Sequence, residues 1–334
     1  MSGGGVPYHL RVNKAVDRNV FIEVLTRLHG KHPLLNYRYV TFGGPFLEDL
    51  RLVHDRFGLT DLVSIESDEN TFARQRFNCP LATIDLRLQD SSDFISQYDS
   101  EKSSIVWLDY AAAHDQGVQL GEVQQLLSLM RQGDVLKVTL NANPTAVKVP
   151  KAQASADASS TSERLELRRK VIEQRFGDFC DKVAVDDVDS NKSFSRLLYT
   201  ALRQAAYRGV SSRPGIRFHI VTALRYSDGP HQMVTVTGIV GDEAEVKEIV
   251  EAGRFAGWDL YAPNVGEVPA LINVPQLSVR ERLVVDSQLP GADAARLAEA
   301  LGFACSEDSD ESADLLKSYI RYYRHLPFFS RIIP

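Results

Sequence analysis

The segment Ile216–Val240, IRFHIVTALRYSDGPHQMVTVTGIV, decides the fold. Its two runs are rich in β-branched residues and are divided by Ser-Asp-Gly-Pro at 227–230, which predicts an antiparallel hairpin. Upstream of it, strand-like segments alternate with helical ones. These strands are expected at 37–42, 61–66, 83–87, 104–108 and 135–140. Short connections between such units are typical of parallel sheets. The sequence therefore predicts an α/β fold with a doubly wound, mostly parallel, seven-stranded sheet ending in an antiparallel hairpin.

The distribution of these elements divides the chain into parts. Residues 1–35 hold an amphipathic helix, expected at Asp17–His29, which we interpret as a lid before the sheet. Residues 36–254 form the sheet domain, in which about 144–162 is rich in Ala, Ser and Lys and predicts a mobile loop. Residues 255–334 are expected to form a helical appendage. Its helices are expected near 278–286, 292–301 and 313–324.

The composition of the 334 residues, 44% hydrophobic and 25% charged, is that of an ordinary globular protein. No apolar run approaches the roughly 20 residues that a membrane span needs, so no membrane partner is expected. The three cysteines are widely spaced, which favours a reducing compartment and a cytoplasmic location. The net charge of −6 lacks a strong basic excess, so nucleic acid is not a favoured partner.

Candidate binding residues follow the first two predicted strands, at the edge where open α/β sheets bind ligands. Gly43 and Gly44 end the first strand, and glycines let the backbone approach a ligand closely. An ordinary tight turn is the alternative. Glu66 ends the second strand, where a carboxylate can accept both hydroxyl protons of a ribose. The alternative is a helix cap, for which Asp68 is the better candidate.

The next two strands also end in polar residues. Asp90 and Ser91 follow the third strand, where a carboxylate can accept from an exocyclic amine such as that of adenine. Capping of the next helix is the equal alternative. Asp109 and Tyr110 follow the fourth strand, at the centre of the sheet. A carboxylate beside an aromatic ring at this place is a candidate for holding substrate or a reacting group, and a loop-stabilising aspartate is the alternative.

The segment 63–74, VSIESDENTFAR, resembles the acidic second motif of the class I S-adenosylmethionine-dependent methyltransferase superfamily, in its O-methyltransferase-like branch. The resemblance extends over about 36–240 and includes the strand order. It implies S-adenosylmethionine as the cofactor, with Glu66 on the ribose, Asp90 on the adenine amine and the two glycines at the methionine end. Asp109-Tyr110 resembles the fourth motif, at the methyl-transfer centre. The implied cofactor-binding residues are Phe42, Gly43, Gly44, Glu66, Ser67, Asp90, Ser91 and Asp109.

The chain departs from this family pattern at the first strand. The family has an acidic residue there, before a longer glycine pattern, whereas Thr41 stands near that place and Pro45 follows the two glycines. Glu48 or Asp49 is the candidate replacement for the missing carboxylate. This depleted turn is the reason to keep a catalytically inactive relative as an alternative.

Methyl transfer to a hydroxyl benefits from a base or a metal. The eight histidines form no metal-ligand spacing, so no metal is expected, and Asp109 and Lys14 are the candidate catalytic residues. The polar stretch 10–18 is interpreted as a substrate clamp, with helix capping by Asn13 or Asp17 as the alternative. The candidate substrate residues are Tyr110, Arg11, Asn13 and His114.

The first functional hypothesis is a methyltransferase acting on an oxygen or nitrogen of a small molecule or a protein group. The second is an S-adenosylmethionine-binding pseudoenzyme or sensor that acts through a protein partner. The third is an RNA or DNA methyltransferase gripping its substrate with the basic stretch 164–170, although alternating glutamates there favour a solvated helix face. The aromatic residues at 319–329 predict packing of the last helix, with a homodimer or partner surface as the alternative.

Overall fold

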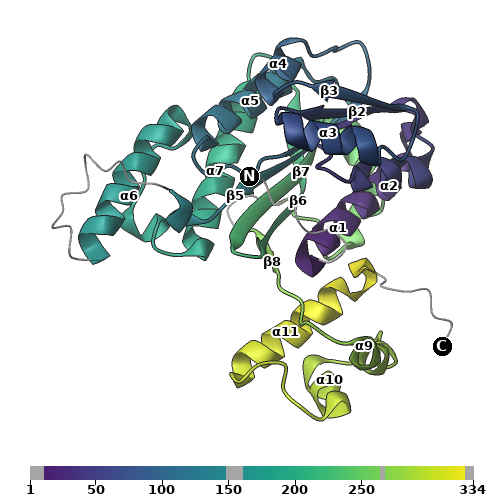
Figure 1. Ribbon diagram of the computed structural model, residues 1–334, viewed down its shortest axis with the longest axis vertical. Helices are drawn as coiled ribbons and strands as arrows, with labels where there is room; N and C mark the ends of the chain where they lie inside the picture. Colours follow the sequence, from purple (N-terminus) through teal and green to yellow (C-terminus); the bar gives the residue numbers. More distant parts are fainter. Residues whose placement is uncertain (1–10, 148–160, 264–267, 328–334) are drawn as a thin grey trace.

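The computed structural model describes residues 11–147, 161–263 and 268–327. It contains a sheet with the strand order β3-β2-β1-β4-β5-β7-β6-β8 (Figure 1). The strands β1 to β5 run parallel, and β7 is antiparallel to both of its neighbours. The strands are β1 (Arg38–Thr41), β2 (Asp61–Glu66), β3 (Ile84–Leu88), β4 (Ser104–Asp109), β5 (Val135–Asn141), β6 (Arg217–Asp228), β7 (His231–Gly241) and β8 (Ala270–Ile272). The predicted α/β fold, parallel strands and terminal hairpin are confirmed.

Helices cover both faces of the sheet and form two separate hydrophobic cores. The first core packs α1 (Val12–His29), α2 (Glu48–Phe57) and α8 (Glu243–Ala252) against the sheet. The second core packs α4 (Ser91–Ser96), α5 (Gln116–Leu129), α6 (Thr161–Phe176) and α7 (Asn191–Val210) against the other face. The remaining α-helices are α3 (Glu69–Asn78), α9 (Val279–Asp286), α10 (Ala294–Leu301) and α11 (Ser309–Tyr322).

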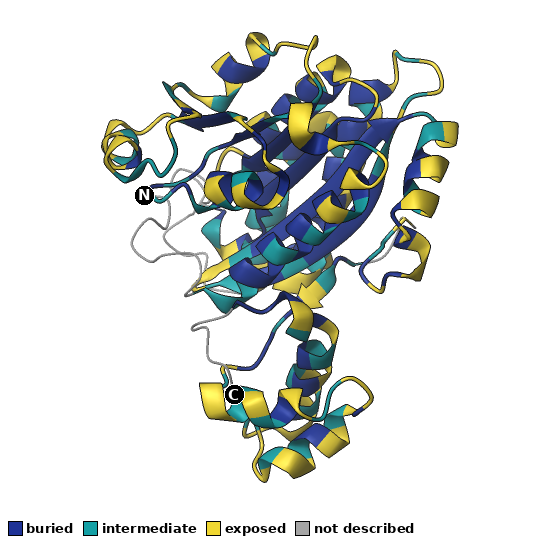
Figure 2. Ribbon diagram, turned by 90° about the vertical axis from the view of Figure 1, so that its right-hand side faces the viewer, coloured by how far each residue is buried: buried dark blue, intermediate teal, exposed yellow. Residues whose placement is uncertain are grey.

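The central strands are buried on both sides, as Figure 2 shows. Successive side chains of β4 alternate between the two cores: Ile105 and Trp107 face α1, and Val106 and Leu108 face α5. Strands covered by helices on both faces read as continuous apolar runs, because neither face meets water. The same alternation determines which face of the sheet each side chain at the end of β4 points to.

Within the described residues the sheet has eight strands, one more than the seven expected. The additional strand β8 pairs in parallel with β6, and Leu224 lies opposite Ala270. The segment before it also packs on the first core through Phe255, Trp258 and Leu260. The expected boundary at residue 255 therefore falls inside the sheet domain. A strand of three residues has too few positions to show a period of two.

Helix α1 begins at Val12, five residues before the expected start at Asp17. Arg11 is its N-cap residue and makes no side-chain cap, so helix capping by Asn13 or Asp17 is not observed. The first turns of α1 show no helical pattern of apolar residues in the sequence, because Lys14, Asp17 and Arg18 are charged and yet buried. Of the loop expected at 144–162, residues 148–160 lie outside the described part of the chain, residues 144–146 form a short 3-10 helix and α6 already begins at Thr161.

The C-terminal helices contact the sheet domain through α11 and α1. Tyr319 and Tyr322 of α11 are buried, which confirms the predicted packing role for the aromatic residues described there. The 3-10 helix Tyr323–His325 follows, and Asn19 of α1 donates to the backbone oxygen of His325 at 2.8 Å. The described helices α9 and α10 lie beyond α11, away from the sheet (Figure 1). The C-terminal segment thus covers the outer side of α1.

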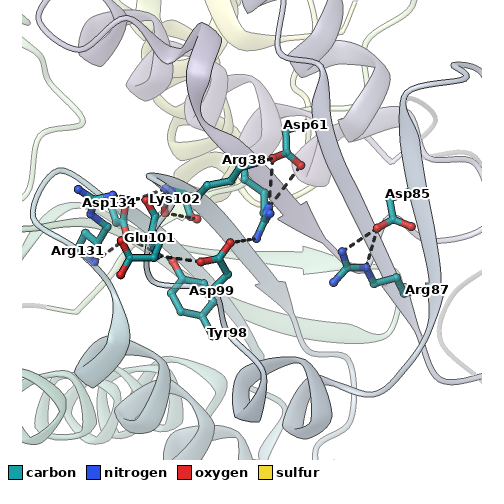
Figure 3. A network of polar contacts seen from close by, with 11 residues as sticks. Arg38, Asp61, Asp85, Arg87, Tyr98, Asp99, Glu101, Lys102, Arg131 and Asp134 are labelled. Atoms are coloured by element: carbon teal, nitrogen blue, oxygen red, sulfur yellow. Dashed lines mark hydrogen bonds and ion pairs between the residues drawn. The ribbon is translucent and has the colours of Figure 1, made fainter.

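A polar network ties the amino ends of the strands (Figure 3). Asp61 of β2 accepts from Arg38 of β1 at 3.4 Å and also pairs with Lys102. Asp134 accepts from the backbone N–H groups of Ser104 and Arg131, each at 2.7 Å. These contacts hold the edge of the sheet opposite to the carboxyl ends of β1 to β5, where the candidate site lies.

The pH dependence of stability tests the packing of the C-terminal segment. Burial lowers the pKa of His325 to about 4, below its ordinary value of 6.5. Between these pH values the unfolded chain binds a proton that the folded chain excludes, so acidification lowers the free energy of unfolding, by up to about 3 kcal/mol. His325→Phe should remove this part of the loss. Urea unfolding of both proteins at pH 7.0, 5.5 and 4.5 measures it, and parallel pH dependences would contradict the assignment.

Candidate active site

The turn after β1 is built around two glycines with left-handed backbone angles. Gly43 has φ +68° and Gly44 has φ +56°. A Cβ on Gly43 would lie 2.5 Å from Ser64 Oγ and 2.7 Å from Leu47 Cδ2, so a larger residue does not fit. The turn passes into α2 through Leu47, which also has a positive φ of 54°. The expected glycine turn is therefore a tightly packed one, closely held against β2.

Helix α3 holds this turn with amide side chains that the sequence analysis missed. The Gln75 side chain is fully buried, and its Nε2 donates to the backbone oxygens of Phe42 and Gly44 at 3.0 and 3.1 Å. Asn78 Nδ2 donates to the backbone oxygen of Pro45 at 2.8 Å. The signal that was available is a glutamine and an asparagine at spacing i, i+3, which share one side of a helix.

Glu66 lies at the end of β2, half-buried, beside the start of α3. Its Oε1 accepts from the backbone N–H of Asp68 at 2.9 Å, and burial raises its pKa. Asp68 accepts from the backbone N–H of Thr71 and caps α3, as expected. Ser67 between them is exposed. A carboxylate has about four lone-pair positions, so the turn leaves Glu66 with acceptor capacity for hydroxyl groups.

Asp90 follows β3 and serves as the N-cap of α4, because its Oδ1 accepts from the backbone N–H of Asp93 at 2.8 Å. This is the capping alternative that the sequence left open. Asp90 is exposed, and the half-buried Ser91 is the first residue of α4. A cap uses one side of the carboxylate, and the other remains open to solvent.

Lys14 and Asp109 meet at the carboxyl end of β4. Lys14 Nζ lies 3.0 Å from Asp109 Oδ2, although the two residues are 95 positions apart in the chain. Burial raises the pKa of Asp109, but the charge and hydrogen bond of Lys14 and the charges of Lys137 and Arg18 outweigh it, so the pKa ends below its usual value. Asp109 therefore remains ionised. The structure brings together the two residues that the sequence named as catalytic.

Two of the candidate substrate residues lie elsewhere. Tyr110 is buried on the α5 side of the sheet, where its hydroxyl donates to Glu122 Oε2, and its ring packs edge-on against Phe42. His114 is exposed in the loop before α5 and pairs with Asp115 at 3.1 Å. The structure does not bring either residue to the Lys14–Asp109 pair. Tyr110 directly follows Asp109 and so points to the opposite face of the sheet, and His114 lies in the loop beyond.

The other two candidate substrate residues fasten the start of α1. Arg11 Nη1 lies 2.7 Å from Asp228 Oδ2 at the end of β6. Asn13 donates to the backbone oxygen of Ser227 and accepts from the backbone N–H of Val274. These contacts join α1 to the hairpin and to the segment after β8. Lys14 is thus held at a fixed place over the sheet.

Further charged residues, whose pairing the sequence did not predict, surround the Lys14–Asp109 pair. Lys137 of β5 pairs with Asp17 of α1, with 2.8 Å between Nζ and Oδ1. Arg18 pairs with Asp49 and, at 3.2 Å, with Glu48. The two acids considered as substitutes for the missing carboxylate of the first strand are thus in contact with α1. A lysine inside the apolar run of β5 was the available signal for this cluster.

Two kinds of feature are not found in the described part of the chain. Among residues 11–147, 161–263 and 268–327, no group of three or more histidine, cysteine or acidic side chains could hold a metal ion. Within the same ranges, no helix has the length and apolar character needed to cross a membrane.

Gly43→Ala tests whether the turn depends on close packing. The new Cβ would clash with Ser64 and Leu47 in addition to straining a positive φ, so we expect a loss of about 2–4 kcal/mol in the free energy of unfolding. Gly302→Ala is the matched control, because Gly302 has φ +75° but no atom within 4 Å of an added Cβ. It should cost only about 1–2 kcal/mol. Equal losses in urea unfolding would show that backbone strain alone accounts for Gly43.

The solved structures with similar folds are distant. Trm1 from Pyrococcus horikoshii, solved with S-adenosyl-L-methionine, is 10% identical, with a TM-score of 0.43 over 91% of this chain and 75% of that one. The plantazolicin methyltransferase BamL, solved with SAH, is 12% identical, with a TM-score of 0.40 over 67% and 85%. The O-methyltransferase from Bacillus cereus, also solved with SAH, is 14% identical, with a TM-score of 0.34 over 67% and 80%.

Identities and TM-scores this low carry no argument about substrate. None of the curated proteins compared with the chain matches its sequence. The model of one protein family does match, over residues 6–334, and so includes the C-terminal helices as well as the sheet. The chain therefore belongs to the family described as "Putative O-methyltransferase".

Proposed function

We propose that the protein is an S-adenosylmethionine-dependent methyltransferase that methylates an oxygen or a nitrogen of a small molecule or a protein group. The ion pair between Lys14 and Asp109 carries this proposal. It lies at the carboxyl end of the central strand β4, and β4 neighbours β1, whose end forms the glycine turn. Ligands of open α/β sheets bind at this edge. Membership of the O-methyltransferase family favours an oxygen over a nitrogen as the methyl acceptor.

The residues at the ends of β1 and β2 fit the cofactor. Gly43 and Gly44 keep side chains away from the turn, and Gln75 holds two of its carbonyl oxygens, which leaves a rigid backbone surface for a ligand. Glu66 offers a carboxylate with free acceptor capacity for the two ribose hydroxyls. Asp90, at the end of the neighbouring strand β3, adds an exposed carboxylate for an amine.

Lys14 and Asp109 are the groups that act on the methyl acceptor. Bound at this edge, S-adenosylmethionine would supply an electrophilic methyl group, whose transfer would break the carbon–sulfur bond and leave the electron pair on sulfur. An acceptor hydroxyl becomes nucleophilic as it passes its proton to the ionised Asp109 carboxylate, and the Lys14 ammonium stabilises the developing negative charge on the acceptor oxygen. The ionised Asp109 holds Lys14 in place and orients the acceptor by hydrogen bonding. Alignment of the acceptor supplies much of the rate of an in-line displacement.

The two other hypotheses have less support. The sensor hypothesis rests on the short glycine turn and on the buried Thr41, which stands where the pattern of the class I methyltransferase superfamily has an acid. The nucleic-acid hypothesis rests on the basic stretch of α6. There, Arg169 pairs with Glu166 at 2.8 Å and with Glu173 at 2.7 Å, which supports a solvated helix face. These pairs reduce the charge that phosphates would meet.

Glu66→Ala should weaken S-adenosylmethionine binding at least about tenfold, because it removes an acceptor that two ribose hydroxyls share. Isothermal titration calorimetry with S-adenosylmethionine and with S-adenosylhomocysteine measures both affinities. Glu69→Ala is the matched control: Glu69 is an exposed acid three residues further, on the first turn of α3. It should leave both affinities unchanged.

Lack of binding by the unmodified protein for both ligands would refute the methyltransferase proposal. Tight binding without methyl transfer to any small-molecule or protein acceptor pool would instead favour the sensor. Salt-dependent binding of RNA or DNA, with affinity falling steeply between 50 and about 200 mM salt, would favour the third hypothesis.

Lys14→Met should lower transfer of a tritiated methyl group to the acceptor by about 100-fold or more, because it removes the charge that stabilises the acceptor oxygen. Cofactor affinity should change by less than about threefold, since Lys14 acts on the acceptor. Lys14→Arg keeps the charge and should retain more activity than Lys14→Met. Equal activity of the wild type and Lys14→Met would remove Lys14 from the mechanism.

A further inference from the structure

One side of α1 is lined with charged residues although it faces the core. Lys14, Asp17, Arg18 and Phe21 are spaced i, i+3, i+4 and i+7, so they share the side of the helix that faces the sheet. All are buried. Each of the three charges pairs with a different element: Asp109 of β4, Lys137 of β5 and Asp49 of α2. The helix is thus fixed by ion pairs in three directions.

The ion pairs that α1 makes with β4 and with β5 follow one another along the helix and along the strands. In the register of these strands, Asp109 lies opposite Thr139, and Trp107 lies opposite Lys137. Lys137 is therefore two residues, about 6.6 Å, deeper in the sheet than Asp109. Asp17 lies three residues, about 4.5 Å, after Lys14 along the helix. Rotation of α1 by one residue position, about 100°, would break both ion pairs at once.

The deeper pair is shielded from water. The side chains of Lys137 and Asp17 are 2% and 0% exposed. Lys137 Nζ lies 4.7 Å from the centre of the Trp107 ring and 5.2 Å from that of Phe21. Asp17 Oδ2 is buried and has no hydrogen-bond partner among the residues that the structure describes. A pair that leaves one carboxylate oxygen unsatisfied is poorly suited to stabilise the fold.

Buried ion pairs contribute little net stability, because desolvation of both charges offsets their attraction. Replacement of such a pair by apolar residues of similar volume is often neutral or stabilising, and the best-attested use of such pairs is to fix a register. Lys137 also acts on the reaction centre by its charge, since it helps to hold the pKa of Asp109 below its usual value. The Asp17–Lys137 pair is therefore placed to fix the position of α1 and to keep Asp109 ionised.

We propose that Asp17 and Lys137 are positioning residues: their buried ion pair fixes the rotation of α1, so that Lys14 stays on Asp109. This inference rests on the proposed function for the catalytic meaning of the Lys14–Asp109 contact. The contact itself can be measured without cofactor or methyl acceptor. Failure of the positioning proposal and failure of the proposed function are therefore distinguishable.

The double variant Asp17→Leu/Lys137→Met tests the proposal, because it replaces the pair by apolar side chains and leaves no single charge buried. We expect a thermal unfolding midpoint equal to or above that of the wild type. Acetylation of Lys14 by acetic anhydride, followed by mass spectrometry of its peptide, reports on the contact. Lys14 should react at least about tenfold faster in the double variant, because the neutral amine is the form that acetic anhydride acylates, and an amine that has left its carboxylate is deprotonated more easily and reached more easily by the reagent. Lys317, with a side chain 66% exposed, serves as the internal reference.

Matched variants separate positioning from a general structural role. Asp314→Leu/Lys317→Met removes an exposed ion pair and should leave the labelling of Lys14 unchanged. Asp17→Asn keeps an oxygen for Lys137 Nζ but leaves its charge unpaired, so its unfolding midpoint should fall while the folded protein retains the slow labelling of the wild type. Fast labelling of Lys14 in Asp17→Asn would contradict positioning by this hydrogen bond.

Two further outcomes would overturn the proposal. A folded double variant in which Lys14 reacts at the wild-type rate would show that other contacts fix α1. A double variant that folds but has a clearly lower unfolding midpoint would show that the pair serves stability. Where methyl transfer is measurable, the double variant should lower kcat more than it changes KM, and it should move the pH profile, because Asp109 loses a neighbouring positive charge.

Discussion

Burial of charge next to the central strands constrains the rest of this molecule. Lys137 and Asp17 are almost fully shielded, and charges in such a place are tolerated only when paired. Helix α1 must therefore lie against β4 and β5 in one orientation, and it must itself be covered on its outer side. The C-terminal segment provides part of that cover through the contact of Asn19 with His325. The charged site and the C-terminal helices are thus parts of one arrangement, which fits a family match that runs through both.

The fold was largely predictable because its main elements follow simple periodicities. The buried runs of β1 to β5 and the turn at 227–230 were enough to predict a parallel sheet and the hairpin, and the strand order followed from the family resemblance. The start of α1 was not predictable in this way, since its buried face carries Lys14, Asp17 and Arg18, which read as solvent-facing residues. Their partners come from β4, β5 and α2, which are remote in sequence. Strand β8 was missed because three residues cannot show an alternation.

The candidate site was predictable to the extent that topology determines it. Parallel strands end at one edge, so Glu66, Asp90 and Asp109 had to lie along that edge. Topology does not determine the face of the sheet to which each side chain points. Asp109 faces α1 and meets Lys14, whereas Tyr110, one residue later, faces α5 and meets Glu122. The alternation of β-strands could have separated these two residues. The spacing of Gln75 and Asn78, and a lysine inside the apolar run of β5, mark Gln75 and Lys137 as unusual, but their partners are set by tertiary packing and could not have been named.

The balance of charges in the cluster bears on how the site can act. Lys14, Arg18 and Lys137 face Asp109, Asp49 and Asp17, so these charges offset each other pair by pair, and Glu48 adds one further acid beside Arg18. Such a cluster has little net charge with which to attract a ligand from a distance. Its effect comes from the fixed directions of its dipoles, which act strongly at short range in a water-poor environment. A methyl donor that loses its positive charge during transfer needs a field of this kind, because strong attraction by a net negative site would stabilise the donor more than the transition state and so slow the reaction.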